Sequence, residues 1–232
     1  MVITLIALIL GTIPSFAWLL FFLKEDIHPE PKKLIFTTFI SGLVAALFAL
    51  LVMNLLSKMT NIIDVNHLNV VSLLIMAGIE EVVKFFFVFI LIKNRLCDEC
   101  EEPIDIMIYM ITAALGFAAF ENLAVTFNLA ASPFNDLLIG QMTGAIIFRF
   151  IGATLLHALS SGVIGYWWAI GILRYRARKY IINGLIIATL LHTFFNYLIL
   201  SFKDVIIYPT VFLSIIAFLT FLNFDQLRKK NL

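Results

Sequence analysis

The sequence predicts an all-α membrane protein, a polytopic bundle of about seven transmembrane helices in a single domain of residues 1–232. Of the 232 residues, 62% are hydrophobic and only 13% are charged, and the mean hydropathy is +1.04. Soluble domains average roughly 45–50% apolar and about 25% charged residues. This composition excludes a secreted disulfide scaffold, a nucleic-acid-binding domain and a disordered tail.

The predicted spans follow from length, because a transmembrane helix needs about 20 mostly apolar residues. The first stretch lacks a basic segment before it and a small-residue cleavage site, so we expect a retained span and not a signal peptide. The qualifying stretches are 2–23, 34–56, 70–92, 106–127, 143–173, 181–200 and 205–224.

The orientation follows from the basic residues, since short cytoplasmic loops are enriched in Lys and Arg. Of the 16 basic residues, twelve fall in the first, third and fifth loops and the C-terminal tail. Only Lys58 and Lys203 fall in loops on the other side, and two more lie inside spans. We therefore expect an extracytoplasmic N-terminus and a cytoplasmic C-terminus, in a multi-pass protein of a bacterial cell membrane.

Ionisable groups inside spans cost a few kcal/mol each even on lenient insertion scales, and they are usually functional. Four consecutive spans carry such groups or a carboxamide. The third carries Glu80, Glu81 and Lys84, the fourth Glu121 and Asn122, the fifth Arg149 and His157, and the sixth His192 and Asn196.

The spacing places these groups in one region. Glu80 and Lys84 share a helix face, and so do His192 and Asn196, because residues four apart are neighbours on a helix. At about 1.5 Å per residue, Glu80 lies about 15 Å and His192 about 12 Å below the outer ends of their spans. We expect one cavity that is open toward the outside.

Structural interpretations of the individual residues stay open. Glu81 and Lys84 are as well explained by a neutralised bridge as by tuning of a catalytic charge. Glu121 and Arg149 lie at similar depth, and pairing across helices is favoured for them over direct chemistry. An intramembrane His is often a packing element, and Asn196 is consistent with a hydrogen bond between helices.

Hydrolysis of a peptide bond is the chemistry that this set suits. It requires an activated water, stabilisation of an oxyanion and protonation of the leaving amine. A carboxylate in an apolar cavity is a useful base for water, and Glu80 fits that role. His157 can hold or protonate the same water, while His192 and Asn196 can donate to the oxyanion. Ser160 and Ser161 follow His157 at a spacing that small-residue packing also produces.

The order of motifs resembles the PrsW family of bacterial intramembrane proteases, which is related to the CAAX prenyl-endopeptidases. Four motifs carry the resemblance, together with a Pro-Glu-Pro segment at residues 29–31, and they extend to Asn196. The motifs are Glu80-Glu81-x-x-Lys84, Phe117-x-x-x-Glu121-Asn122, His157 and His192-x-x-x-Asn196.

The resemblance implies a site-1 protease that cuts a membrane-anchored anti-sigma factor on its extracytoplasmic side in a stress response. It implies that Glu80 and Glu81 are the essential paired glutamates and that His157, His192 and Asn196 belong to the site. Glu121 stands where the CAAX branch has a histidine. This departure argues against that branch's water-binding geometry and against prenylated substrates.

Three alternatives to a metal-free protease remain. A divalent metal held by the carboxylates and imidazoles would also activate water, although the resemblance favours a site without a cofactor. The cytoplasmic pair Cys97 and Cys100 is a weak zinc signal, because it lacks a second pair. The other class of function is a proton- or ion-coupled transporter, since membrane carboxylates and histidines also relay protons. A binding scaffold with the same pocket is also compatible with the sequence.

Overall fold

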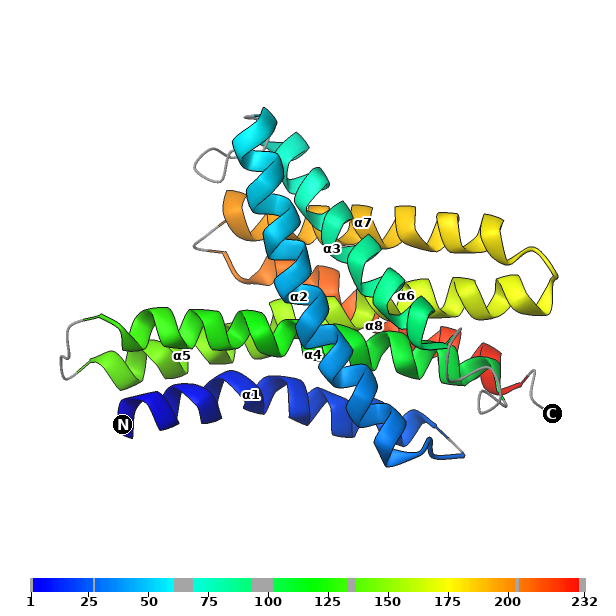
Figure 1. The fold of residues 1–232 in the computed structure, drawn as a ribbon, viewed down its shortest axis with the longest axis horizontal. Coiled ribbons are helices and arrows are strands. Elements are labelled where there is room, and N and C mark those ends of the chain that lie inside the picture. The colour runs from blue at the N-terminus through cyan, green and yellow to red at the C-terminus, as the bar shows by residue number, and fades with distance from the viewer. Residues whose placement is uncertain are drawn as a thin grey trace.

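The computed structural model describes residues 2–26, 28–60, 69–92, 102–132, 137–202 and 205–229. Within these ranges the chain is helical and contains no strand (Figure 1), which confirms the all-α prediction. The elements are α1 (Val2–Phe22), η1 (Leu23–Glu25), α2 (Lys32–Thr60), α3 (Val70–Leu91), α4 (Pro103–Ala130), α5 (Leu138–Ile151), α6 (Ala153–Leu173), α7 (Ala177–Ser201) and α8 (Ile207–Arg228).

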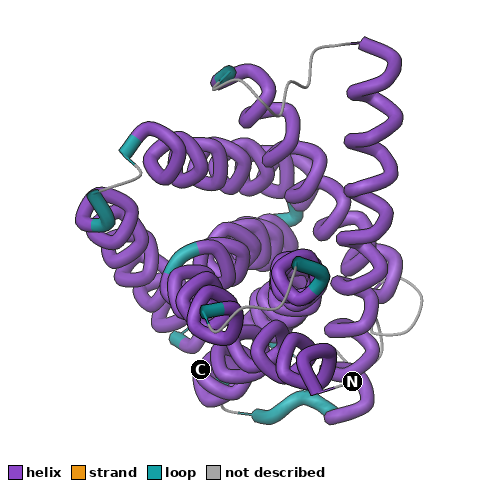
Figure 2. Tube along the Cα trace, turned by 90° about the vertical axis from the view of Figure 1, so that its left-hand side faces the viewer, coloured by secondary structure: helices purple, strands orange, loops and turns teal. Residues whose placement is uncertain are grey.

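Helix α4 is the centre of the bundle. A helix that is hydrophobic on every side is a buried helix, and 89% of the most apolar window of α4 is buried, against 22–39% in the other candidate spans. Helices α1, α2 and α6 pack against it. Figure 2 shows several of the helices end on, gathered into one bundle. Helix α4 is therefore the element around which α1, α2 and α6 are arranged.

Small residues set the rotation of α4. A Cβ atom at Gly42 of α2 would lie 1.9 Å from the carbonyl oxygen of Ala113, and one at Gly116 would lie 2.0 Å from that of Phe39. Close backbone contact at small residues is typical of membrane helices. Glu121 follows Gly116 by five residues, about 140° around the helix, and so projects away from α2.

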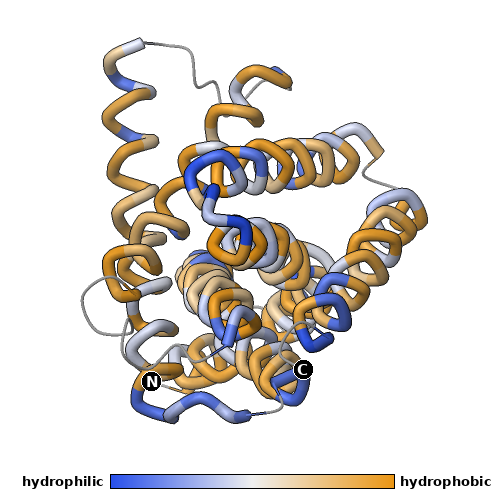
Figure 3. The backbone as a smooth tube through the Cα atoms, turned by 90° about the vertical axis from the view of Figure 1, so that its right-hand side faces the viewer, coloured by the Kyte–Doolittle hydropathy of each residue, from blue (hydrophilic) through white to orange (hydrophobic). Residues whose placement is uncertain are grey.

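Six helical segments are long and apolar enough to cross a membrane: α1 with η1, α2, α4, α5 with α6, α7 and α8. The one predicted span that is missing from these six is the third, 70–92, which forms α3, a helix of 22 residues. It does not qualify on composition because Glu80, Glu81 and Lys84 lie near its middle. The outward surfaces are apolar, and in Figure 3 the hydrophilic stretches lie largely at helix ends and loops. The chain is a multi-pass membrane protein.

The start of α1 and the end of α8 lie at opposite ends of the bundle (Figure 1). In Figure 1, α1 starts at one end of the long axis, whereas the α6–α7 turn and the end of α8 lie at the other. This arrangement agrees with an odd number of crossings. It also places the basic α6–α7 turn and the basic C-terminal end on the same side, as the distribution of Lys and Arg predicts.

The predicted fifth span, 143–173, lies within one candidate span, residues 138–173, but it is not one continuous helix. The chain forms α5 and α6 with a break at Gly152, whose φ of −98° and ψ of −96° are not helical. A Cβ atom there would lie 2.8 Å from the carbonyl oxygen of Phe148, so the break requires glycine. Trp18 of α1 holds α5 by donating from Nε1 to the carbonyl oxygen of Phe150, at 2.8 Å.

The Pro-Glu-Pro segment joins α1 to α2 and is tied to α4. Tyr109 of α4 donates its hydroxyl hydrogen to the Glu30 carboxylate, and the Glu30 backbone amide donates to Asp26. His28 pairs with Glu102, the residue before α4, at 2.7 Å. The loop therefore fixes the start of α2 against the start of the central helix.

Candidate active site

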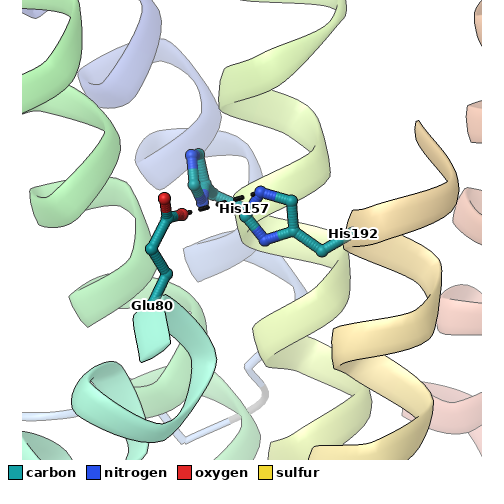
Figure 4. Close-up of side chains that lie close together, drawn as sticks. All are labelled: Glu80, His157 and His192. Carbon is teal, nitrogen blue, oxygen red and sulfur yellow. Dashed lines mark ion pairs between the residues drawn. The ribbon is translucent and has the colours of Figure 1, made fainter. Parts of the chain in front are cut away.

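Three helices bring the predicted carboxylates and imidazoles together inside the bundle. Glu80 and Glu81 come from α3, His157 from α6 and His192 from α7, and all four are buried. Figure 4 shows the side chains of Glu80, His157 and His192 pointing toward one another. One ligand atom from each of these three lies within 4.8 Å of the others. The predicted convergence is confirmed, although Asn196 is not part of it.

Glu81 is the more fully bonded of the two adjacent glutamates. Its Oε1 accepts from Lys84 Nζ at 2.7 Å, from Ser160 Oγ at 3.0 Å and from His192 Nδ1 at 2.7 Å. Its Oε2 accepts from Ser161 Oγ at 3.5 Å. Both oxygens are thus occupied by groups from α3, α6 and α7, which suits a side chain that orients others.

Glu80 has the opposite character. Its Oε2 is buried and has no hydrogen-bond partner among the described residues. The nearest charged or polar atom recorded for it is His192 Nε2, at 3.6 Å. A buried carboxylate oxygen without a partner is rare and calls for a ligand or a reacting group at that point. Since Glu81 holds Nδ1 of His192, Nε2 is the ring atom left facing Glu80.

His157 has partners at both ring nitrogens. Nδ1 lies 3.1 Å from Lys84 Nζ, and Nε2 lies 2.9 Å from Glu121 Oε2. Its ring packs between those of Phe117 and His192, at centroid distances of 5.4 and 5.0 Å. The His157 ring is therefore held in position by contacts at both nitrogens and by two neighbouring rings.

A second group of polar side chains, from α4, α5 and α6, lies next to this centre. Arg149 Nη2 donates to Glu121 Oε2 at 2.9 Å, and Arg149 Nε donates to the side-chain oxygen Oδ1 of Asn122. Asn122 in turn donates to Thr154 Oγ1 at 3.0 Å. The Glu121 and Arg149 side chains are 31% and 22% exposed, so the cluster reaches the surface here. The pairing expected for Glu121 and Arg149 is present.

Asn196 lies one turn beyond His192 on α7. It is half-buried, and no hydrogen bond to another described residue is recorded for it. Its place on the same helix as His192 follows from the spacing of four residues. Its donation to an oxyanion stays a prediction.

Comparisons with known proteins identify the family of the chain. A family model described as "PrsW family intramembrane metalloprotease" matches residues 30–222. The chain belongs to the PrsW family. A protein named Protease PrsW from Geobacillus kaustophilus (strain HTA426) is 25% identical over 193 residues, which cover 82% of this chain and 78% of the relative. No solved structure matches the chain significantly. Membership of the PrsW family makes the chain a peptidase that works within a membrane, and the matched residues include every member of the cluster.

The PrsW description raises the question of a metal. Glu80, His157 and His192 make a donor set of two imidazoles and one carboxylate, which catalytic zinc sites use, and their spacing could hold an ion. The family description and the group formed by Glu80, His157 and His192 both count against the expectation that the site has no cofactor. Glu80 Oε2 has no hydrogen-bond partner among the described residues, and His192 Nε2 lies 3.6 Å from it. Both nitrogens of His157 are already engaged. The three residues as arranged therefore do not fit a three-ligand metal centre.

Some parts of this PrsW site were not predicted. The spacing of Ser160 and Ser161 after His157 assigns them no role, but both donate to Glu81. The signal was available, because hydroxyls three and four residues after a buried His lie on its face of the helix. Thr154, which anchors Asn122, gave no such signal. Cys97 and Cys100 lie outside the described residues.

Proposed function

We propose that this protease makes the first cut in a membrane-anchored anti-sigma factor, on the extracytoplasmic side, with a water activated by Glu80. The observation that carries the mechanism is the unpartnered, buried Oε2 of Glu80 beside His192 Nε2. Oxygens and nitrogens hydrogen-bond at about 2.7–3.0 Å, so one water can contact both atoms across their 3.6 Å separation. That water is the nucleophile of the proposed reaction.

The reaction then needs few groups. Glu80 accepts a proton from the water as its oxygen attacks the carbonyl carbon of the substrate. The protonated ring of His192 and the Asn196 amide donate to the developing oxyanion, a form of stabilisation that depends on positioned donors. When the carbon–nitrogen bond breaks, Glu80 returns its proton to the leaving amine, so that atoms and protons balance.

Glu81, Lys84 and His157 serve as positioning residues in this mechanism. Glu81 holds the His192 ring through Nδ1, which directs Nε2 toward Glu80. His157 packs edge to face on His192, with an interplanar angle of 88°, and limits rotation of that ring. Side chains fixed in this way support a reacting geometry better than mobile ones.

The side of cleavage is supported by the direction of access. Glu121 and Arg149, the exposed members of the cluster, lie toward the end of the bundle at which α1 starts. The basic loops predict that this end faces outward. Partial exposure of these two side chains at that end is compatible with a single-span substrate cut outside the cytoplasm, and the PrsW resemblance of the motifs supports an anti-sigma factor. Family membership does not favour the transporter alternative.

The test is co-expression with a single-span anti-sigma factor that carries an extracytoplasmic tag, followed by immunoblotting for the cut fragment. We expect cleavage by the natural sequence and by Glu25→Gln, a carboxylate paired with Arg228 far from the cluster. We expect none from Glu80→Gln and strongly reduced cleavage from His157→Ala. Cleavage that survives both changes would contradict the proposal.

A further inference from the structure

Lys84 is a fully buried cation inside the cluster, and two hydrogen-bond acceptors and one aromatic ring lie around its ammonium group. Its side chain is 0% exposed. An ammonium has three donor hydrogens and no acceptor. Nζ lies 2.7 Å from Glu81 Oε1, 3.1 Å from His157 Nδ1 and 5.2 Å from the centroid of the Phe117 ring. A carboxylate, a ring nitrogen and an aromatic face thus receive the ammonium, and aromatic faces attract cations.

These contacts fix the tautomer of His157. Because an ammonium can only donate, Nδ1 of His157 must accept and can carry no hydrogen. The ring hydrogen then sits on Nε2, where Glu121 Oε2 accepts it at 2.9 Å. In a neutral imidazole one nitrogen donates and the other accepts, and both assignments are satisfied here.

The same contacts deny His157 to a metal by either nitrogen. Ligation through Nε2 requires the hydrogen on Nδ1, where it would face the Lys84 ammonium instead of an acceptor. Metal-bound histidines usually give their other N–H to a carboxylate or carbonyl, and Lys84 offers the reverse. Ligation through Nδ1 requires the ammonium to leave the place that it occupies.

The net charge of the cluster also disfavours a bound metal ion. The cluster holds three carboxylates, on Glu80, Glu81 and Glu121, against the cations of Lys84 and Arg149. One proton neutralises it, whereas a divalent ion leaves it with excess positive charge. Unbalanced charge in a buried site is costly. Without the Lys84 ammonium, a divalent ion would instead balance the carboxylates and Arg149.

We propose that Lys84 is a positioning residue that holds His157 as an Nε2–H donor and thereby keeps divalent metal out of the group formed by Glu80, His157 and His192. Removing its ammonium opens a latent two-imidazole, one-carboxylate metal site. The inference concerns the site of the proposed function, but it is measured by metal content and ring protonation. It can therefore fail while the protease assignment stands, and the reverse also holds.

The first experiment measures zinc and cobalt binding in detergent. The natural protein, Lys84→Met and Lys58→Met are equilibrated with Zn²⁺, desalted and analysed for metal by mass spectrometry. Lys58→Met is the matched control, since Lys58 is an exposed lysine at the end of α2. We expect about one retained zinc per chain for Lys84→Met only, with affinity at least about 10–100-fold above the natural protein, the range that groups behind metal ligands contribute.

Cobalt identifies the ligands. Co²⁺ in Lys84→Met should give the intense visible absorption of a four-coordinate site, and adding His192→Ala should abolish it. Stoichiometric zinc in the natural protein would overturn the proposal. So would a folded Lys84→Met variant that retains no more zinc than Lys58→Met.

A second measurement needs no Lys84 variant, in case the loss of the ammonium prevents folding. The chain has four histidines, and ¹⁵N-histidine labelling with the His157→Gln spectrum as reference assigns the His157 signals. We expect an unprotonated Nδ1 and a protonated Nε2, unchanged by added Zn²⁺. A protonated Nδ1, or a zinc-dependent shift at His157, would refute the inference.

Discussion

Replacing Glu81 with Gln should destabilise the protein, whereas the same change at the preceding residue should stop catalysis and leave stability nearly intact. Glu81 is the counter-ion of the buried Lys84 ammonium and accepts four hydrogen bonds. Glu80 Oε2 has no partner among the described residues. The two positions are adjacent on one helix and receive the same substitution, so each variant is the control for the other.

The magnitudes follow from these contacts. Removing one partner of a buried ion pair costs about 3–5 kcal/mol, because the other charge is left uncompensated. In a chain of this length each kcal/mol lowers the unfolding midpoint by about 2–4 °C, so Glu81→Gln should lower it by about 6–20 °C. Glu80→Gln removes a general base, and such groups contribute about 10²–10⁴-fold to rates.

Both quantities can be measured on the same preparations. Thermal unfolding in detergent gives the midpoint, and cleavage of a purified single-span substrate gives kcat and KM. Equal midpoints for the two variants would refute the assignment of Glu81 as the structural counter-ion. Retention of most of the rate by Glu80→Gln would refute its assignment as the base.

Three further predictions follow. Asn196→Ala should lower kcat by about 10²–10³-fold, as loss of one oxyanion donor does elsewhere, with KM nearly unchanged; a rise in KM alone would contradict that role. Arg149→Ala removes the hydrogen bonds to Glu121 and to the side-chain oxygen of Asn122, which lie in a partly exposed region. It should therefore lower the free energy of unfolding by at most a few kcal/mol and leave some cleavage. Complete loss of cleavage in a folded variant would make Arg149 part of the chemistry. Burial raises the pKa of Glu30 to about 7, from 4.5, so the folded state holds a proton that the unfolded chain has lost. That stability is fully present below about pH 4.5 and is lost as the pH rises through about 7. Glu30→Gln should therefore make the unfolding midpoint depend less on pH in this range. An unchanged pH dependence of the midpoint would show that Glu30 is not its source.

Hydropathy and length predict most of this fold, because the solvent of a membrane protein imposes one rule on every span. The rule gave the approximate extents of α1, α2, α4, α7 and α8, as well as α3 despite its charges. It could not locate the break between α5 and α6, since an apolar stretch with one glycine reads as continuous. A side chain at Gly152 would crowd the Phe148 carbonyl, a local steric constraint that hydropathy does not encode.

The site was predictable to the level of which residues meet, but not of what each does. Spacing of three and four residues placed Lys84 beside both glutamates and Asn196 beside His192. It could not decide between Glu80 and Glu81, because the rotation of α3 against α6 and α7 sets which one is bonded. Spacing also placed Ser160 and Ser161 on the helix face of His157, but it could not show that they donate to Glu81.

A chain of contacts runs from the surface to the buried oxygen, and its order bears on mechanism. It passes from Arg149 to Glu121, His157, Lys84, Glu81 and His192, and each step along it is a hydrogen bond of 2.7–3.1 Å. Only the last step, from His192 to Glu80, is longer, at 3.6 Å. In a low-dielectric interior an unsatisfied polar group is costly, and a fully satisfied network would leave nothing free to react. In this cluster Glu80 Oε2 is the described carboxylate oxygen that lacks a hydrogen bond, while the neighbouring charged groups are paired. That oxygen therefore stays available to a water and to the proton that the water must lose.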